Sequence, residues 1–229
     1  MRTLAIGHRG ASGHEYENSP AAFRRAVALG ADGVELDIHA TSDGALLVHH
    51  DPVVDGLGHI STLPVAAFDN YRLPNGEAIP LLPEILVICQ GLDVWVELKT
   101  LPPEADQILL ATLATAPTPA CCAVHSFDHR IIARLGDQRP ELRRGVLLSS
   151  YLLDVLHALT GTGADTLWME TSFVDADLVQ RLHADGVQLI AWTANDSAEI
   201  DRLLGLGVDG ICGNYPDRIH AARQSRSPD

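Results

Sequence analysis

The stretch "TLAIGHRGASGHEYENSPAAFRRAVALGADGVELDI", residues 3–38, holds two short apolar segments with one helical pattern between them. The segments "TLAIGH" and "GVELDI" both end in polar residues, which is typical of a buried strand that reaches the edge of a sheet. Between them, Ser19 is suited to cap a helix and Pro20 is suited to its first position. The stretch therefore predicts a strand, a helix and a second strand, in that order.

The same alternation continues along the rest of the chain. Seven further apolar segments have this strand character, and they are "ALLVHH", "DVWVELK", "CCAVHSF", "RGVLLSS", "TLWMETS", "VQLIAWTAN" and "DGICGN". Helical patterns such as "DADLVQRLHADG", which ends at Gly186, lie between most of them. Eight or nine strand and helix units in 229 residues predict an α/β fold, a single-domain TIM (β/α) barrel.

The domain boundaries follow from the places where this alternation stops. We expect the barrel domain to occupy residues 1–220 and the polar tail 221–229 to be frayed. Residues 52–80 carry Pro, Gly and Asn without clear periodicity, and we interpret them as a loop excursion that is too short for a second domain.

One connection is too short to join parallel strands. Only "TSDG" separates "ELDIHA" from "ALLVHH", whereas a parallel crossover needs about a dozen residues or more. A hairpin is therefore expected, with its turn at residues 42–44. The returning strand would bring His50 back to the level of Glu35 and Asp37.

Composition restricts the classes of protein that the chain can be. Its 229 residues are 46% hydrophobic, which is enough to bury a full core and argues against disorder. A formal net charge of -14 argues against a nucleic-acid partner, so an anionic substrate must be bound by local positive charge. The four cysteines suggest free thiols, and neither a signal peptide nor a run of ~20 apolar residues is present. We therefore expect a cytoplasmic protein without a membrane span.

Carboxylates on two predicted strands indicate a cation site. Glu35 and Asp37 are two residues apart, so both side chains lie on one face of their strand, and Glu97 and Lys99 repeat this spacing. Inward carboxylates cost several kcal/mol unless a cation compensates them. Three oxygen donors favour Mg²⁺ or Ca²⁺. A solvated pair at a strand end is the alternative, and the second strand with the same spacing weakens it.

Two histidines follow apolar segments at expected strand ends. Barrel enzymes place catalytic groups there, so His8 and His50 are candidates for an acid–base pair. A zinc site built from His39, His49 or His59 is an alternative, although their spacing matches no compact zinc motif.

Cationic and aromatic residues lie beside these groups in the sequence. Arg9 and Lys99 can bind phosphate oxygens, and a salt bridge from Arg9 to Glu17 could orient the arginine. Phe127 and Trp192 are candidates for an apolar wall at the mouth of the site, with packing inside the barrel as an equal alternative.

Taken together, these residues match the motifs of one family. The matching segments are "HRG" at 8–10 with "EN" at 17–18, "ELDI" at 35–38, "HHDP" at 49–52, "ELK" at 97–99, "SF" at 126–127, "WTAN" at 192–195 and "GVDGI" at 207–211. They span nearly the whole chain in the expected order. The sequence thus resembles the glycerophosphodiester phosphodiesterases.

The resemblance implies a metal-dependent hydrolase of glycerophosphodiesters in lipid and glycerol metabolism, with sn-glycerol 3-phosphate and an alcohol as products. It also implies a TIM barrel that binds one divalent cation, Mg²⁺ or Ca²⁺, with Mn²⁺ as a third candidate. The family pattern assigns roles to nine residues: His8 and His50 as general acid and base, Glu35, Asp37 and Glu97 as metal ligands, Arg9 and Lys99 as phosphate contacts, and Glu17 and Asn18 as their support.

Three positions depart from the family pattern. Tyr16 and Ser19 replace a proline and a threonine in "YENS", and Asn214 replaces an aspartate in "GNYP". The excursion after His50 is also short, which leaves the head group open. One alternative is a lipid diester, as in a lysophospholipase D or sphingomyelinase-D-like enzyme, although 5% aromatic residues and no basic amphipathic helix favour a soluble substrate. Another is a non-catalytic barrel that binds phosphorylated metabolites.

Overall fold

The protein folds as a closed barrel of parallel strands in the computed structural model, which describes residues 2–226. Within that range, eight parallel strands close the ring because β1 pairs with both β2 and β11. The barrel strands are β1 (Leu4–Gly7), β2 (Gly33–Ala40), β6 (Asp93–Thr100), β7 (Cys122–Ser126), β8 (Arg143–Leu148), β9 (Thr166–Glu170), β10 (Gln188–Trp192) and β11 (Gly210–Gly213). The predicted TIM barrel is confirmed, and each of its strands coincides with a predicted segment.

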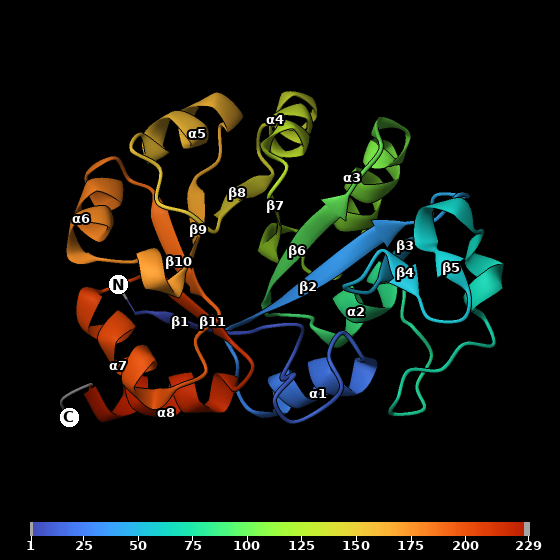
Figure 1. Cartoon of the computed structure of the whole chain (residues 1–229), viewed down its shortest axis with the longest axis horizontal. Helices are drawn as coiled ribbons and strands as arrows, with labels where there is room; N and C mark the ends of the chain where they lie inside the picture. The colour runs from blue at the N-terminus through green and yellow to red at the C-terminus, as the bar shows by residue number, and fades with distance from the viewer. Residues whose placement is uncertain (1, 227–229) are drawn as a thin grey trace.

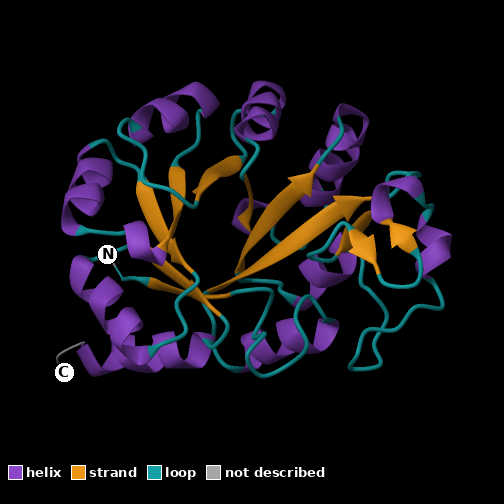
Figure 2. Ribbon diagram, in the orientation of Figure 1, coloured by secondary structure: helices purple, strands orange, loops and turns teal. Residues whose placement is uncertain are grey.

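Helices surround the barrel on the outside (Figures 1 and 2). They are α1 (Pro20–Ala28), α2 (Leu82–Ile88), α3 (Asp106–Ala114), α4 (His129–Gln138), α5 (Val155–Thr162), α6 (Ala176–Ala184), α7 (Ser197–Leu206) and α8 (Pro216–Arg226). The predicted cap of the first helix is present, because the Ser19 hydroxyl accepts a hydrogen bond from the Ala22 backbone N–H at 3.2 Å. Among the described residues, no helix combines the length and the apolar character that a membrane crossing requires.

The predicted frayed tail, 221–229, is wrong for the residues up to Arg226, because helix α8 includes them. Arg223 is buried there, and its guanidinium donates to the Thr3 carbonyl oxygen at 2.8 Å and pairs with Asp32. These contacts hold the last helix to the residues that directly precede β1 and β2. Residues 227–229 of the predicted tail lie outside the described residues.

The short connection forms the predicted hairpin. Strand β3 (Leu46–Val48) runs antiparallel to β2, with Val48 opposite Ile38. The His49 backbone N–H donates to the Asp37 carbonyl oxygen at 3.1 Å. The hairpin therefore returns the chain to the level of the β2 carboxylates directly before His50.

The excursion after His50 has a small core of its own. It contains the two-stranded sheet of β4 (Val53–Val54) and β5 (Gly58–His59), followed by 3₁₀ turns at Ile60–Thr62 and Val65–Phe68. A separate hydrophobic cluster holds it together, made of Leu47, Val54, Ile60, Phe68, Leu73 and Ile79. The excursion lies beyond β3 at the right of Figure 1, beside the carboxyl end of β2.

Apolar side chains fill the inside of the barrel. The interior cluster consists of Ile6, Trp95, Ala123, Leu147, Trp168, Ile190 and Cys212. The rings of Trp95 and Trp168 meet edge to face with their centroids 5.3 Å apart. This apolar cluster forms a floor beneath the polar side chains at the carboxyl end of the strands, and Arg143 packs on the ring of Trp95 from the amino end.

The loop after β1 approaches helix α1 closely at Gly10. This residue has a φ of +80°, and a Cβ there would lie 2.7 Å from the Ala22 carbonyl carbon. We expect Gly10→Ala to lower the free energy of unfolding by roughly 2–4 kcal/mol, from left-handed strain plus overpacking. Gly56→Ala is the matched control, because Gly56 has a φ of +79° and open space around it. Urea unfolding of both variants measures the difference, and equal losses would contradict the packing argument.

Candidate active site

A pocket opens at the carboxyl end of the barrel strands. Its lining consists of His8, Arg9, Glu35, His50, Glu97, Lys99, His125, Phe127, Leu147, Trp168, Trp192 and Cys212. Eight of these are residues that the sequence singled out for chemistry or substrate binding. They come from strands far apart in the sequence, so closure of the barrel brings them together.

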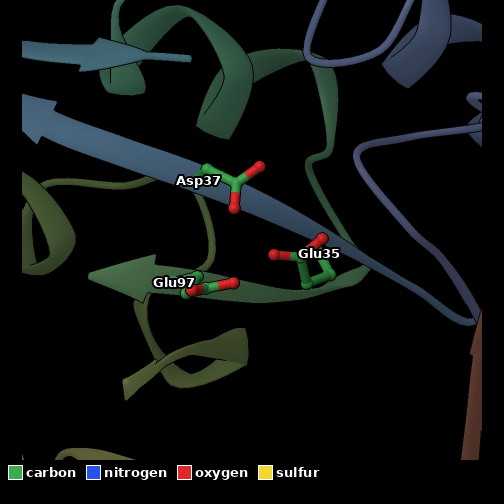
Figure 3. A group of neighbouring side chains, drawn as sticks. All are labelled: Glu35, Asp37 and Glu97. Atoms are coloured by element: carbon green, nitrogen blue, oxygen red, sulfur yellow. The ribbon is translucent and has the colours of Figure 1, made fainter. Parts of the chain in front are cut away.

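Three buried carboxylates form the centre of the site (Figure 3). Glu35 and Asp37 project from the same face of β2, and Glu97 stands opposite Asp37 in the register of β6. One oxygen from each lies within 4.8 Å of the other two. Glu35 is 2% exposed, Asp37 0% and Glu97 8%, so water does little to stabilise their charges.

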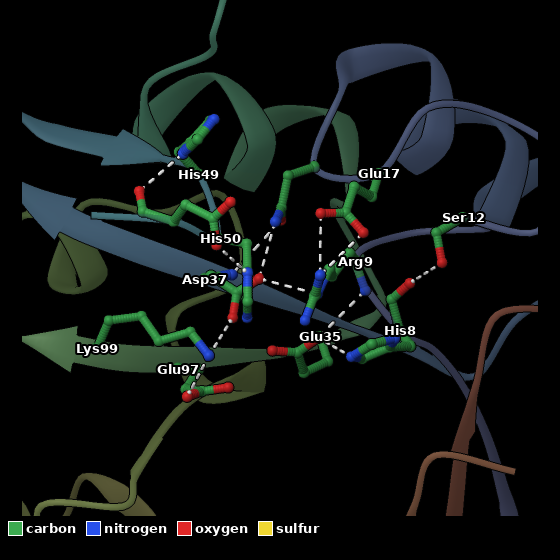
Figure 4. A network of polar contacts seen from close by, with 12 residues as sticks. His8, Arg9, Ser12, Glu17, Glu35, Asp37, His49, His50, Glu97 and Lys99 are labelled. Atoms are coloured by element: carbon green, nitrogen blue, oxygen red, sulfur yellow. Dashed lines mark hydrogen bonds and ion pairs between the residues drawn. The ribbon is translucent and has the colours of Figure 1, made fainter. Parts of the chain in front are cut away.

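Two cationic side chains partly balance these charges (Figure 4). Lys99 Nζ lies 2.7 Å from Glu97 Oε1 and 3.1 Å from Asp37 Oδ1. Arg9 Nε lies 3.2 Å from Asp37 Oδ2, and the Arg9 backbone N–H donates to Glu35 Oε2 at 3.1 Å. If all groups were ionised, three negative charges would face two positive ones, and a net negative charge would remain buried.

The loop after β1 holds Arg9 in place. Arg9 and Asn18 both have positive φ values, 53° and 55°, which are uncommon for residues other than glycine. The Arg9 guanidinium donates to both oxygens of Glu17, at 2.9 and 2.8 Å. The Asn18 side-chain amide donates to Asp37 Oδ2 at 2.8 Å. Glu17 and Asn18 thus connect this loop to the carboxylate centre, and the predicted Arg9–Glu17 salt bridge is present.

Both candidate proton carriers line the pocket, and each has one ring nitrogen engaged. His8 Nδ1 lies 2.8 Å from Asn214 Oδ1, while its Nε2 lies 4.0 Å from Glu35 Oε2. His50 Nδ1 lies 2.8 Å from Asp51 Oδ1. The second ring nitrogen of each histidine therefore remains for chemistry in the pocket.

The zinc alternative receives no support from the geometry. Within residues 2–226, the cluster of three or more close metal-ligating side chains is that of Glu35, Asp37 and Glu97. His39 Nε2 lies 3.0 Å from the His50 carbonyl oxygen, His49 Nδ1 lies 2.9 Å from the Asp51 carbonyl oxygen, and His59 Nδ1 contacts the Ser61 hydroxyl. The three histidines thus bind separate partners.

Phe127 and Trp192 pack against each other at the mouth of the pocket. Their ring centroids are 5.6 Å apart at an interplanar angle of 79°, and Phe127 is 47% exposed. Trp192 also packs against the apolar cluster inside the barrel, so both sequence alternatives describe part of its surroundings.

Sequence reasoning missed His125, which also lines the pocket. Its ring is buried against Trp168, with centroids 4.2 Å apart. Burial lowers the pKa of His125 to about 4, so the ring is neutral at pH 7. The signal was present in "CCAVHSF", since residues two apart in a strand share a face and His125 precedes Phe127 by two.

Comparison with known proteins agrees with this geometry. The model of the glycerophosphoryl diester phosphodiesterase family matches residues 8–218. The chain belongs to this family. It is 31% identical to the glycerophosphodiester phosphodiesterase of Caldanaerobacter subterraneus subsp. tengcongensis over 235 residues, which cover 96% of this chain and 97% of that relative.

Solved structures of similar proteins share the fold. An Oleispira antarctica phosphodiesterase, determined in complex with the product sn-glycerol-3-phosphate, aligns with a TM-score of 0.91 and 25% identity, covering 97% of each chain. A glycerophosphodiester phosphodiesterase from Parabacteroides distasonis aligns with a TM-score of 0.90 and 23% identity over 99% of each chain. The protein is therefore a phosphodiester hydrolase built on a TIM barrel.

Enzymes of this phosphodiesterase family generally use a divalent cation, and the carboxylate centre fits one. Its three donors are carboxylate oxygens, which suit hard cations. Glu35 Oε1 is buried and has no hydrogen-bond partner in the described part of the chain. The unbalanced negative charge described above is the third observation in favour of a cation at this centre.

The pKa values of the three carboxyl groups are shifted in different directions, although all three groups are buried. Burial, together with the neighbouring carboxylates, raises the pKa of Glu35 and of Glu97 to about 7. Burial opposes ionisation of Asp37 as well, but Lys99, Arg9 and the Asn18 hydrogen bond lower its pKa to about 2. The enzyme without a cation therefore holds protons on Glu35 and Glu97 at pH values where exposed carboxyl groups have lost them.

This shift predicts a pH dependence of stability in EDTA. The pKa of Glu97 rises from an ordinary 4.5 to about 7, so the folded state binds more protons than the unfolded chain between these values. The free energy of unfolding should then fall as pH rises through this window, by roughly 1–3 kcal/mol for this group.

Urea unfolding of the wild type and of Glu97→Gln at several pH values isolates the contribution of Glu97, because the other titrating groups are common to both proteins. We expect the fall with pH to be smaller in Glu97→Gln. If the free energy of unfolding of the wild type falls no more with rising pH than that of Glu97→Gln, the raised pKa of Glu97 is contradicted.

Proposed function

We propose that this enzyme hydrolyses glycerophosphodiesters to sn-glycerol 3-phosphate and an alcohol, with one divalent cation and a pair of histidines. The observation that carries the proposal is one pocket that combines His8 and His50 with the buried carboxylate centre and two cationic side chains. The product bound to the similar Oleispira antarctica enzyme supports the same substrate class.

Glu35, Asp37 and Glu97 would hold the cation, for which Mg²⁺, Ca²⁺ and Mn²⁺ are the candidates. When bound, it would reduce the negative charge of the phosphodiester and stabilise the charge that develops in the transition state. Arg9 and Lys99 already line the pocket and would bind the phosphate oxygens. Glu17 and Asn18 would keep Arg9 and Asp37 in position for this contact.

The hydrogen bonds of the two histidines support different roles. If His8 Nδ1–H donates to Asn214 Oδ1, Nε2 carries the lone pair and can accept a proton from the nucleophile. The Asp51 carboxylate can only accept, so His50 Nδ1–H donates to it, and a proton carried on Nε2 can pass to the leaving alkoxide. We therefore assign His8 as the general base and His50 as the general acid. The nucleophile is water or the glycerol hydroxyl, and both routes use these residues.

Phe127 and Trp192 would contact the carbon skeleton of the substrate at the mouth. The nearby loops also favour a second candidate, a lipid diester. Exposed apolar side chains follow several barrel strands at this end, including Tyr16 after β1, Phe127 after β7 and Leu153, which is 96% exposed, after β8. The sequence had indicated no apolar docking surface, and these residues could contact an acyl chain.

Release of glycerol 3-phosphate tests the proposal. We expect no release from glycerophosphocholine or glycerophosphoethanolamine after EDTA treatment, and release after Mg²⁺, Ca²⁺ or Mn²⁺ is added. Faster turnover of lysophosphatidylcholine would favour the lipid diester. A folded enzyme that binds these diesters with every cation and cleaves none would support the non-catalytic barrel instead.

Substitution of the two histidines tests their roles. We expect His8→Ala and His50→Ala each to lower kcat by on the order of 10² to 10⁴-fold, because each variant loses one proton-transfer step. His49→Ala is the matched control, because His49 adjoins His50 in the chain but is not part of the pocket lining. Steady-state kinetics and urea unfolding separate catalysis from folding. Near-normal kcat in either variant would remove that histidine from the mechanism.

A further inference from the structure

We propose that His125 supplies a nitrogen ligand to the divalent cation, in addition to the three carboxylates. This inference rests on the proposed function, because it concerns the cation of that same site. His125 lies on β7 directly opposite Glu97 of β6. Its Nε2 lies 3.8 Å from Glu35 Oε1.

Both of these facing atoms lack partners. Each nitrogen of the His125 ring is buried without a hydrogen bond in the described part of the chain, and the same holds for Glu35 Oε1. Leaving a buried polar group unpaired costs about 1–3 kcal/mol, so native structures rarely do so without a reason. At 3.8 Å, Nε2 and Oε1 are too far apart to bond each other.

One ion would satisfy both atoms. Bonds from a divalent metal to imidazole nitrogen or carboxylate oxygen are about 2.0–2.2 Å long for a small ion such as Zn²⁺, and bonds from Ca²⁺ to oxygen are about 2.3–2.6 Å long. The 3.8 Å separation is shorter than two such bonds placed end to end, so a single ion can contact His125 Nε2 and Glu35 Oε1 together. The carboxylates of Glu35 and Glu97 face one another in the same space (Figure 3).

Packing alone does not account for a histidine at this position. The ring of His125 lies against Trp168 and meets Trp95 at a centroid distance of 5.8 Å. A phenylalanine would make the same aromatic contacts without two unpaired nitrogens. His8 also places Nε2 near Glu35, at 4.0 Å from Oε2, but its other nitrogen is held by Asn214 and we assign it to proton transfer.

A nitrogen ligand changes the preference among cations. Ca²⁺ and Mg²⁺ take oxygen donors, whereas imidazole adds affinity for first-row transition metals. An all-oxygen site would favour Mg²⁺ or Ca²⁺, as the sequence predicts. With His125 as a ligand, we expect Mn²⁺ to bind at least about tenfold more tightly than Ca²⁺.

Electron spin-echo spectroscopy of the Mn²⁺-loaded enzyme tests the ligand directly, without reference to activity. We expect a nitrogen coupling from a coordinated imidazole, which changes when the histidines are labelled with ¹⁵N. It should disappear in His125→Phe and remain in His8→Gln and in His157→Gln, whose histidine is exposed on α5. If His125→Phe does not fold, a coupling that persists in both His8→Gln and His50→Gln still assigns the ligand to His125, because these three histidines line the pocket.

Calorimetric titration gives a second readout. His125→Phe should weaken Mn²⁺ binding by about 10–100-fold and change Ca²⁺ binding by less than about threefold. Bound Mn²⁺ without nitrogen coupling, or coupling that disappears in His8→Gln instead, would overturn the inference and leave metal-dependent release of glycerol 3-phosphate standing. A wild type that binds neither ion would overturn both the inference and the cation of the proposed function.

Discussion

Three carboxylates buried at one end of a barrel impose the constraint on which the site depends. Burial disfavours the ionised form of a carboxyl group, so cationic groups must lie beside any that stay charged. Arg9 and Lys99 occupy those positions. Arg9 in turn depends on Glu17 and on a loop whose backbone takes left-handed conformations. The conformation of this loop thus places Arg9 and Asn18 where they stabilise the ionised form of Asp37 inside the protein.

The apolar floor and the polar end of the barrel act together. Trp95 and Trp168 exclude water from below, which strengthens every electrostatic interaction above them. A chain with a net charge of -14 can attract an anion only through local positive charge. In the proposed function, the divalent cation adds its charge to those of Arg9 and Lys99, and together they exceed the charge of the three carboxylates.

Much of the fold was predictable because strand periodicity is a local property. Nine apolar segments corresponded to strands, and the short "TSDG" connection fixed the hairpin that carries His50. The prediction of a frayed tail was wrong because the last helix is held by Arg223, whose partner Thr3 lies near the other end of the sequence. The hydrogen bond between His8 and Asn214 could not be predicted either, because it joins residues 206 positions apart in the sequence. His125 was overlooked although the period of two marked its inward face, because a single histidine in an apolar strand is ordinarily structural.

The barrel closes where β1 meets β11, and this seam has a consequence for when the enzyme becomes active. His8 and Asn214 are 206 residues apart in the sequence and touch only across that seam. The pocket is therefore assembled from the first and the last strand of the barrel. A chain that ends before β11 already contains the three carboxylates and both histidines, yet it lacks the strand that closes the ring. Hydrolysis thus requires that β11 has been synthesised and has paired with β1.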